Sequence, residues 1–582
     1  MLLYLRLALL LLLPWAYWRF IRRRSSAVLR NIPGPKGSSW ATGKHLLSQE
    51  RPTSNTQEGC LNDLINIKAW DYHLNIGKTY GSVARIKGLF GDDDLYIFDP
   101  KALHHVLVKD QHIYEETDSF IQGNKLLFGK GLLTSLGEEH RRQRKMLNPV
   151  FSIAHMREMV PIFYEITHKV RRVFLNKVKQ GSQEVDVVNW MTRIALELIG
   201  QSGLGYSFDE LTENSTQHEY AVAVKQLVPL QGKSNLLIIN LSILPMLTRI
   251  GSPAFRRWVV ERLPMKDVQH LREIIDKLWA TSIQIIDEKR KALAEGDEAV
   301  AAQIGRGKDV ISILMKANMH AAEDEKLCEE ELIGQVTTLT FAATDTTSSA
   351  LSRTFYLLAE HKDVQDKLRE EIRRAKRENS GQDFNYDDLV SLPYLDAVCR
   401  ETLRLYVLLT CVAVGHLLSL PYFSRHPPAS TMMREACQDA ILPLATPVKG
   451  IDGQEIYEIP IPKGTKIHMS ILNSNRNPEF WGADAEEWKP ERWLKPLPEA
   501  LVNARVPGIY SHLMTFLGGG RSCIGFKFSQ LEMKVVLTLM LEDIEFSLSD
   551  KKIYWQMTGI ATPNVDPTSI IPTLPMIISL AK

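Results

Sequence analysis

The chain has 582 residues, of which 45% are hydrophobic and 24% are charged. This composition is typical of a globular protein and excludes wholesale disorder. The formal net charge is only +2, and no arginine-rich stretch or zinc finger is present, so we expect no nucleic-acid partner. The six cysteines form no CxxC pair, which argues against a disulfide framework or a structural zinc site.

The first segment, residues 1–24, predicts a membrane anchor with a basic flank. Residues 2–21 are apolar and long enough to cross the hydrocarbon layer of a bilayer. Aromatic side chains gather at the end of this run and three arginines follow it, which places the remaining chain in the cytosol. A cleaved signal peptide is the alternative, but no small-residue cleavage site follows the apolar run.

Residues 25–37 predict a stiff hinge, because Pro33, Gly34 and Pro35 cannot continue a helix. The remaining residues, 38–582, are expected to form one domain that is mainly α with minor β sheets. Helices are predicted over 156–179, 186–203, 268–295, 330–360, 362–378 and about 525–541. Strands are predicted near 82–86, 95–98, 456–460, 466–469 and in the C-terminal stretch.

Two segments of the first half have uncommon composition. The basic segment 137–145 predicts a helix, and such a helix most often presents its charges to solvent. The apolar segment 236–258 is interrupted by Pro245, Gly251 and Pro253, so it does not predict a second membrane span. It is either a buried loop and helix pair or an apolar flap that dips into a membrane surface and admits apolar substrates.

The predicted helix over 330–360 contains the sequence FAATDTT at residues 341–347. Asp345 and Thr346 form an acid–alcohol pair that could relay protons, and Ala342 and Ala343 leave space beside them. The alternative is that the threonine hydroxyls only bond back to helix carbonyls.

A second pair of polar residues lies in a helical stretch further along the chain. Glu401 and Arg404 are three residues apart, so they lie on one helix face and can pair. Such pairs are common on solvated faces, and the spacing alone carries little weight. The sequence WKPERW at residues 488–493 follows downstream and contributes Arg492.

The sequence FLGGGRSCIG at residues 516–525 has the features that a thiolate ligand of iron requires. Its glycines permit a tight bend, and the helix predicted after Cys523 brings its positive N-terminal end toward the sulfur. Arg521 can donate to a carboxylate, and Phe516 can pack near the ligand. A nucleotide-binding loop is not supported, because residues 516–525 contain neither GKS nor GKT and their glycines do not have the GxGxxG spacing.

This segment resembles the cytochrome P-450 signature F-x-x-G-x-R-x-C-x-G at every fixed position: Phe516, Gly519, Arg521, Cys523 and Gly525. Ser529 stands where alanine is more usual in the family. The other motifs follow in the family's order, and the stretches GEEHRRQRKMLNPVF and NRNPEFWGADAEEWKPERW are most similar to fungal microsomal members. The resemblance implies a cytochrome P-450-like fold with haem b, in which Cys523 is the axial ligand of the iron.

The resemblance also implies roles for residues outside the cysteine loop. His140, Arg144 and Arg434 correspond to contacts of the haem propionates, as does Arg521, and Phe516, Gly519 and Gly525 shape the cofactor site. Asp345 and Thr346 correspond to the proton-relay pair, although Ala343 replaces the family's usual glycine. Glu401, Arg404 and Arg492 correspond to a buried structural network behind the haem.

The implied function is monooxygenation: hydroxylation or another oxidation of an apolar small molecule such as a lipid, terpenoid, secondary metabolite or xenobiotic. Electrons would come from NADPH through a separate flavoprotein reductase, with cytochrome b5 as a second candidate donor, at the endoplasmic reticulum membrane. Arg141, Arg142 and Lys145 suit docking of an acidic reductase. The alternatives are a haem-thiolate isomerase or dehydratase, a non-catalytic haem- or sterol-binding protein, and an inactive product.

The protein could be an inactive product because residues 406–425 depart from the family pattern. The family has prolines almost directly after Arg404, whereas here an apolar run precedes His426. A surface loop should be polar, so we interpret this insert as a retained intron, with a genuine loop as the alternative. Codons for residues 405–407 can contain a splice donor, and a codon for Arg425 can supply the acceptor. If the insert is translated, we expect poor haem incorporation.

Overall fold

The computed structural model describes residues 26–35, 70–88, 92–215, 218–231, 244–296, 298–299, 303–305, 307–406, 431–556, 560–567, 569 and 571–582. The predicted membrane anchor and residues 407–425 of the insert lie outside these ranges. Within them, no helix is both long enough and apolar enough to cross a membrane.

Most of the described chain is helical, which confirms the predicted fold class. The helices are α3 (Trp70–Tyr80), α4 (Pro100–His104), α5 (Asp118–Phe128), α6 (Gly137–Leu147), α7 (Ile153–Val178), α8 (Val187–Leu198), α9 (Glu219–Gln231), α11 (Leu244–Leu247), α12 (Pro253–Arg262), α13 (Lys266–Glu295), α15 (Val310–His320), α16 (Glu329–Glu360), α17 (Lys362–Glu378), α18 (Tyr386–Ser391), α19 (Pro393–Leu405), α20 (Ile471–Asn475), α21 (Pro478–Trp481), α22 (Glu499–Ala504) and α23 (Phe526–Asp543). Short helical turns include η1 (Ser26–Asn31), η9 (Met514–Phe516) and η10 (Gly519–Arg521).

The strands form small sheets. The largest has the order β1-β2-β8-β5-β3, in which β2 and β8 are parallel and the other neighbours are antiparallel. Its strands are β1 (Val83–Lys87), β2 (Asp93–Ile97), β8 (Lys466–Ser470), β5 (Thr431–Ala436) and β3 (Tyr114–Glu115). The others are the pair β6 (Ala440–Lys449) and β7 (Glu455–Ile461), the sheet of β4 (Gln183–Asp186), β12 (Pro575–Leu580) and β9 (Ile544–Leu548), and the pair β10 (Tyr554–Gln556) and β11 (Thr562–Asn564).

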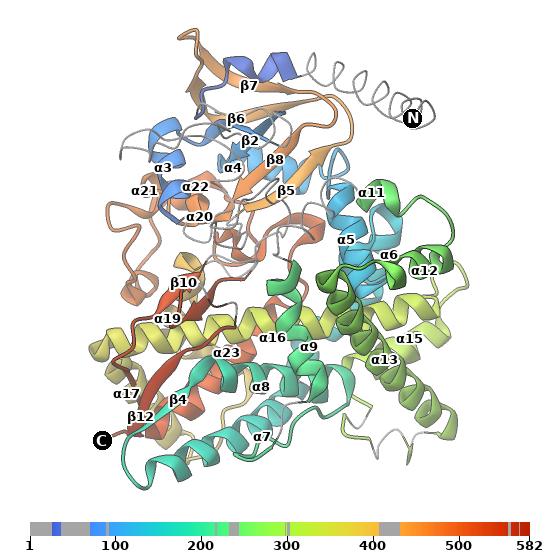
Figure 1. Cartoon of the computed structure of the whole chain (residues 1–582). Helices are drawn as coiled ribbons and strands as arrows, with labels where there is room; N and C mark the ends of the chain where they lie inside the picture. The colour runs from blue at the N-terminus through green and yellow to red at the C-terminus, as the bar shows by residue number, and fades with distance from the viewer. Residues whose placement is uncertain are drawn as a thin grey trace.

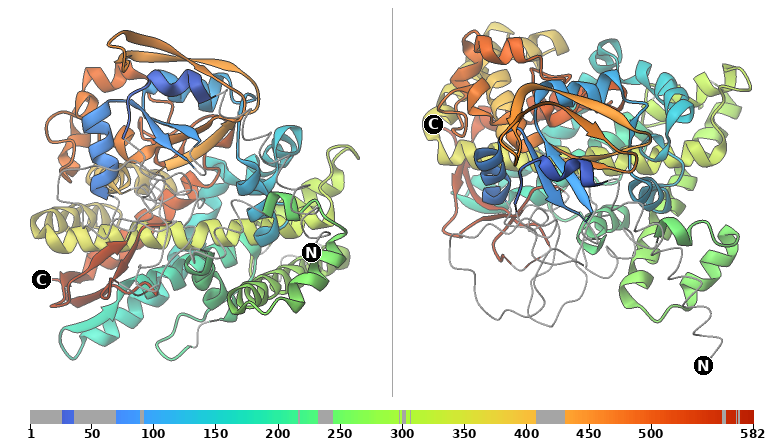
Figure 2. Two further views of the ribbon diagram at one scale, coloured as in Figure 1. Left: turned by 45° about the horizontal axis from the view of Figure 1, so that its top comes forward. Right: turned by 90° about the horizontal axis from the view of Figure 1, so that it is seen from above.

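Helix α16 crosses the middle of the molecule, with the β1–β2–β8–β5 sheet on one side and α7 and α8 on the other (Figure 1). Two turned views keep the β6–β7 hairpin and η1 together on the sheet side, away from α7 (Figure 2). The core continues from α16 into α23 and β9: Phe355 stacks on Phe546 with ring centroids 4.3 Å apart, and Phe528 meets Phe163 edge-on at 4.9 Å. All four rings are almost completely buried.

The described part of the predicted hinge is attached to the body. Leu29 and Ile32 are buried, and the carbonyl of Pro33 accepts a hydrogen bond of 2.9 Å from the backbone N–H of Arg85 in β1. Gly34 is required there, because a Cβ atom would lie 1.9 Å from the carbonyl oxygen of Arg85. This segment therefore fixes where the chain enters the body.

The apolar segment 236–258 is described from residue 244 onward, where it forms α11 and the beginning of α12. Its large side chains face outward: Met246, Leu247, Ile250, Phe255 and Trp258 are all exposed, with Trp258 52% accessible. The interpretation as a buried loop and helix pair is therefore wrong for this part, because burial would require the opposite orientation.

Candidate functional site

The glycine-rich loop before α23 holds Cys523 in a tight bend. The backbone N–H of Cys523 donates to the carbonyl of Phe516 over 2.9 Å, which closes the loop between η9 and α23. Gly519 has φ +70°, and a Cβ atom there would lie 1.8 Å from the carbonyl oxygen of Leu107. Only glycine allows this approach, so the sequence determines the bend. A Cβ on Gly525, in contrast, would meet the Phe151 ring at an ordinary 3.9 Å.

The surroundings of Cys523 fit a thiol that becomes a metal-bound thiolate. Burial raises the pKa of the thiol, whereas a hydrogen bond from the backbone of Gly525 and the charge of Arg144 lower it. Helix α23 begins at Phe526, so its N-terminal end lies just after the sulfur-bearing residue. Without a metal, burial favours the neutral thiol, and a coordinated cation would favour the thiolate.

Three arginines predicted from the resemblance converge near this loop. Burial, together with the charges of Arg521, Arg144 and Arg434, lowers the pKa of His140 to about 3, so all three guanidinium groups lie close to this histidine. Arg144 donates to the carbonyl of Ser522 over 2.6 Å, which attaches α6 to the cysteine loop. Arg434 is buried and Arg144 and Arg521 are partly buried, so this cluster of cations is stabilised by anions, which two carboxylates would supply.

Arg434 supports the fit to a haem most directly. Its Nη2 atom is buried and has no hydrogen-bond partner among the residues that the structure describes. A buried donor without an acceptor is costly, so the position suits a ligand carboxylate. The thiol of Cys523, the cationic cluster and this open donor together fit haem b with its two propionates.

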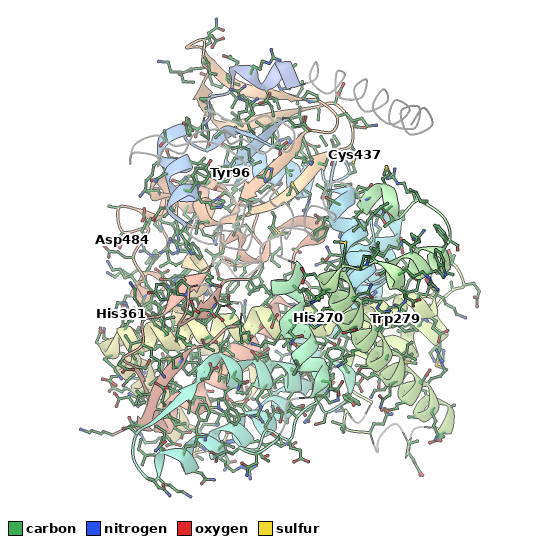
Figure 3. All side chains as sticks on the ribbon, in the orientation of Figure 1. Tyr96, His270, Trp279, His361, Cys437 and Asp484 are labelled. Carbon is green, nitrogen blue, oxygen red and sulfur yellow. The ribbon has the colours of Figure 1, made fainter. Side chains whose placement is uncertain are left out.

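Glu401, Arg404 and Arg492 lie together in a buried network. Glu401 and Arg404 are fully buried and joined by two hydrogen bonds of 2.8 and 2.9 Å. Arg492 donates from Nε to the same carboxylate over 3.3 Å and from Nη1 over 2.8 Å to Asp484, which is labelled in Figure 3. Trp493 also donates to Glu401, over 2.9 Å. This network connects α19 to the segment that follows α21.

The acid–alcohol pair lies in the middle of α16, but its hydroxyl is engaged with the backbone. Thr346 donates to the carbonyl of Ala342 over 2.7 Å. This is the alternative given above for these threonines, in which the hydroxyl bonds back to a helix carbonyl. Burial raises the pKa of the Asp345 carboxyl, and the charge of Lys225 lowers it. Ala342 is exposed, so the helix presents a small residue to open space beside the pair.

Sequence reasoning missed a polar network between α6 and α16. Gln143 is fully buried; it donates to Glu331 over 3.0 Å and accepts from Gln335 over 2.8 Å. Gln335 in turn accepts from the backbone N–H of Leu132 over 3.1 Å. The helical spacing of His140, Gln143 and Leu147, the buried face of α6, could have identified it.

The basic residues predicted for reductase docking already have acidic partners. Arg141 pairs with Glu138, and Lys145 pairs with Glu325 at the surface. Arg142 pairs with Glu331, whose side chain is almost fully buried, so this arginine also stabilises the beginning of α16.

Comparison with known proteins agrees with this geometry. The family model described as Cytochrome P-450 matches residues 61–418 and 441–566. Cytochrome P-450 monooxygenase 91 of Postia placenta is 50% identical over 95% of this chain and 94% of its own length. Ganoderic acid synthetase of Ganoderma lucidum is 44% identical over 94% of this chain and 98% of its own. The chain therefore belongs to the cytochrome P-450 family and is a haem-b-dependent monooxygenase.

Proposed function

We propose that this monooxygenase oxidises an apolar small molecule, such as a lipid, a terpenoid or another secondary metabolite, with electrons that NADPH supplies through a separate flavoprotein reductase. The chain has no flavin or iron–sulfur motif of its own, so a partner must deliver the electrons. The observation that carries the proposal is the acid Asp345 in the middle of α16, beside exposed Ala342, because activation of dioxygen requires a supply of protons.

The haem would be held by Cys523 through iron and by Arg144, Arg434 and Arg521 through its propionates, with His140 beside them. When bound, haem with a thiolate ligand supplies the oxygen-activating chemistry. Phe516 is mostly buried in contact with the rings of Tyr510 and Phe526, at 5.8 and 6.0 Å, which suits a role in excluding water. Gly519 would keep the loop close to Leu107, and Gly525 would place its backbone N–H near the sulfur of Cys523.

In α16, Asp345 would hold a proton, and Thr346 would orient the group that accepts this proton. Burial favours the protonated form of the Asp345 carboxyl, and Lys225 moderates that preference. Because the hydroxyl of Thr346 donates to the carbonyl of Ala342, its oxygen can accept a hydrogen bond from a protonated group. The pair could therefore pass a proton toward the space beside Ala342.

We also propose that the chain is anchored by residues 2–21 in the endoplasmic reticulum membrane, with its catalytic domain in the cytosol. The apolar surface of α11 and α12 would rest on the same membrane and form the flap through which apolar substrates enter. Its exposed side chains, Met246, Ile250, Phe255 and Trp258 among them, support contact with lipid. The substitutions Phe255→Ser and Trp258→Ser should weaken binding of an anchor-deleted chain to phosphatidylcholine vesicles. Unchanged binding would contradict the proposal that α11 and α12 contact the membrane.

Residues 406–425 are proposed to be a retained intron, absent from the active enzyme. Tyr406 is the last described residue before the gap, and the guanidinium of Arg353 stacks on its ring at 3.8 Å. The family model matches residues 406–418 of the insert and leaves 419–440 unmatched, so its gap includes only the last part of the insert. Transcript sequencing tests the proposal: spliced transcripts that still encode the segment would contradict it.

The proposed reaction is tested by reconstituting the full chain with haem, a fungal NADPH reductase and a panel of lipids, terpenoids and ganoderic acids. Ganoderic acids are included because one relative is named for their synthesis. We expect substrate-dependent spectral shifts, NADPH-dependent oxygen uptake and a product that gains oxygen. Conversion of substrate without oxygen uptake would instead indicate an isomerase or dehydratase.

A further inference from the structure

Glu116 lies opposite Arg434 because of the register between two short strands. β3 and β5 are antiparallel, with Tyr114 paired to Ala436 and Glu115 paired to Glu435. The next position of this register places Glu116 across from Arg434. Oε2 of Glu116 lies 2.7 Å from Nη1 of Arg434, and both side chains are almost completely buried.

The two ends of the Arg434 guanidinium have different environments. Nη1 is occupied, because it pairs with Glu116 and also donates to the carbonyl of Met433 over 2.9 Å. Nη2 is buried and has no acceptor within the described ranges. Glu116 therefore fixes the guanidinium from one side and leaves the other side available to a ligand.

The charge balance of the site gives Glu116 a second role. Arg144, Arg434 and Arg521 carry three positive charges around His140, whereas two propionates would bring only two negative charges. Glu116 supplies a further carboxylate, and its charge acts on Arg521, as does the charge of the neighbouring Glu115. A buried anion near a redox centre stabilises the oxidised, more positive state, so it lowers the reduction potential.

We propose that Glu116 is a positioning residue for the haem: it holds Arg434 so that Nη2 faces a propionate, and its charge lowers the reduction potential of the bound iron. This inference rests on the proposed propionate role of Arg434. The holding and the charge can be separated, because glutamine keeps the shape and an oxygen beside Nη1 but removes the charge.

The test compares Glu116→Gln and Glu116→Ala in the haem-loaded full chain. Glu116→Gln should shift the midpoint potential to a more positive value and leave the rate of haem transfer to apomyoglobin within about twofold of the original. Glu116→Ala should shift the potential in the same direction and accelerate haem transfer by about tenfold, because Arg434 loses its support. Glu138→Gln is the matched control, since it removes the same charge from an exposed position on α6 and should change neither quantity.

Arg434→Gln separates failure of this inference from failure of the proposed site. If this variant transfers haem at the original rate, Arg434 does not bind a propionate and the site assignment is wrong. If it loses haem faster but Glu116→Gln leaves the potential unchanged, only the electrostatic role of Glu116 is wrong. If Glu116→Ala does not fold, Glu116→Gln still tests the electrostatic role. Glu116→Asp then tests the holding role: it keeps the charge on a shorter side chain, so we expect faster haem transfer, and an unchanged rate would contradict that role.

Discussion

Removal of the Glu401 carboxylate should cause the largest loss of stability that the buried network can produce. In Glu401→Ala, Arg404 loses hydrogen bonds of 2.8 and 2.9 Å and keeps only its bonds to three backbone carbonyls. Arg492 and Trp493 lose an acceptor as well. A fully buried guanidinium without its counter-ion costs about 3–5 kcal/mol, so we expect the free energy of unfolding to fall by that amount.

The assay is equilibrium urea unfolding of the full chain in detergent, followed by tryptophan fluorescence. Asp276→Ala is the control: it breaks an exposed pair with Arg257, both partners more than 40% accessible, and should cost less than about 1 kcal/mol. The double variant Glu401→Ala with Arg404→Met should lose clearly less than the sum of the single variants, because each single change already removes the pair. A loss below about 1 kcal/mol for Glu401→Ala, or strict additivity, would show that Glu401 does not stabilise Arg404 in the way described.

Three further predictions address other parts of the site. Asp345→Asn should reduce the rate of product formation about 100-fold while NADPH consumption continues, whereas Thr344→Val should leave this rate unchanged. Equal rates of product formation in Asp345→Asn and the original chain would show that Asp345 does not deliver protons. The pKa of His140 in the haem-free native chain is about 3, below its unfolded value, so the unfolded state binds more protons between about pH 3 and 6.5. Stability should therefore fall as the pH falls through this window, by about 1.4 kcal/mol per unit, and this slope should be lost in His140→Asn; an unchanged slope would contradict the assignment. Gln143→Leu should lower the free energy of unfolding in urea by about 1–3 kcal/mol, since it leaves buried partners unsatisfied, while Gln284→Leu at an exposed position should have little effect. Equal unfolding midpoints for these two variants would show that the buried network does not stabilise the fold.

The sequence was most informative where structure depends on neighbouring residues. The predicted helix over 362–378 matches α17 at both ends, because its apolar and charged residues alternate with a helical period. The helix predicted over 186–203 is α-helical only to Leu198 and continues as a π-helix to Leu204. Hydrophobic spacing does not distinguish these two helix types, since both keep the same side chains buried.

Contacts between distant segments were less predictable. The pairing of Glu116 with Arg434 depends on the register of β3 and β5, and β3 contains only two residues. The bond between Gln143 and Gln335 joins residues that are 192 positions apart on two helices, and no motif assigns a role to either glutamine. Both cases concern polar groups whose partner is chosen by tertiary packing, so a single sequence shows the group but not the partner.

Cys523 would supply the axial thiolate of the haem, and the spectrum of the reduced protein under carbon monoxide reports on this ligand. We expect the strongly red-shifted Soret band of thiolate-ligated haem in the full chain, and its loss in Cys523→Ser. Cys399→Ser, which alters a buried cysteine on α19, should keep the band. A spectrum without the red-shifted band in a haem-loaded chain, or a band that survives Cys523→Ser, would contradict the assignment of Cys523 as the axial ligand.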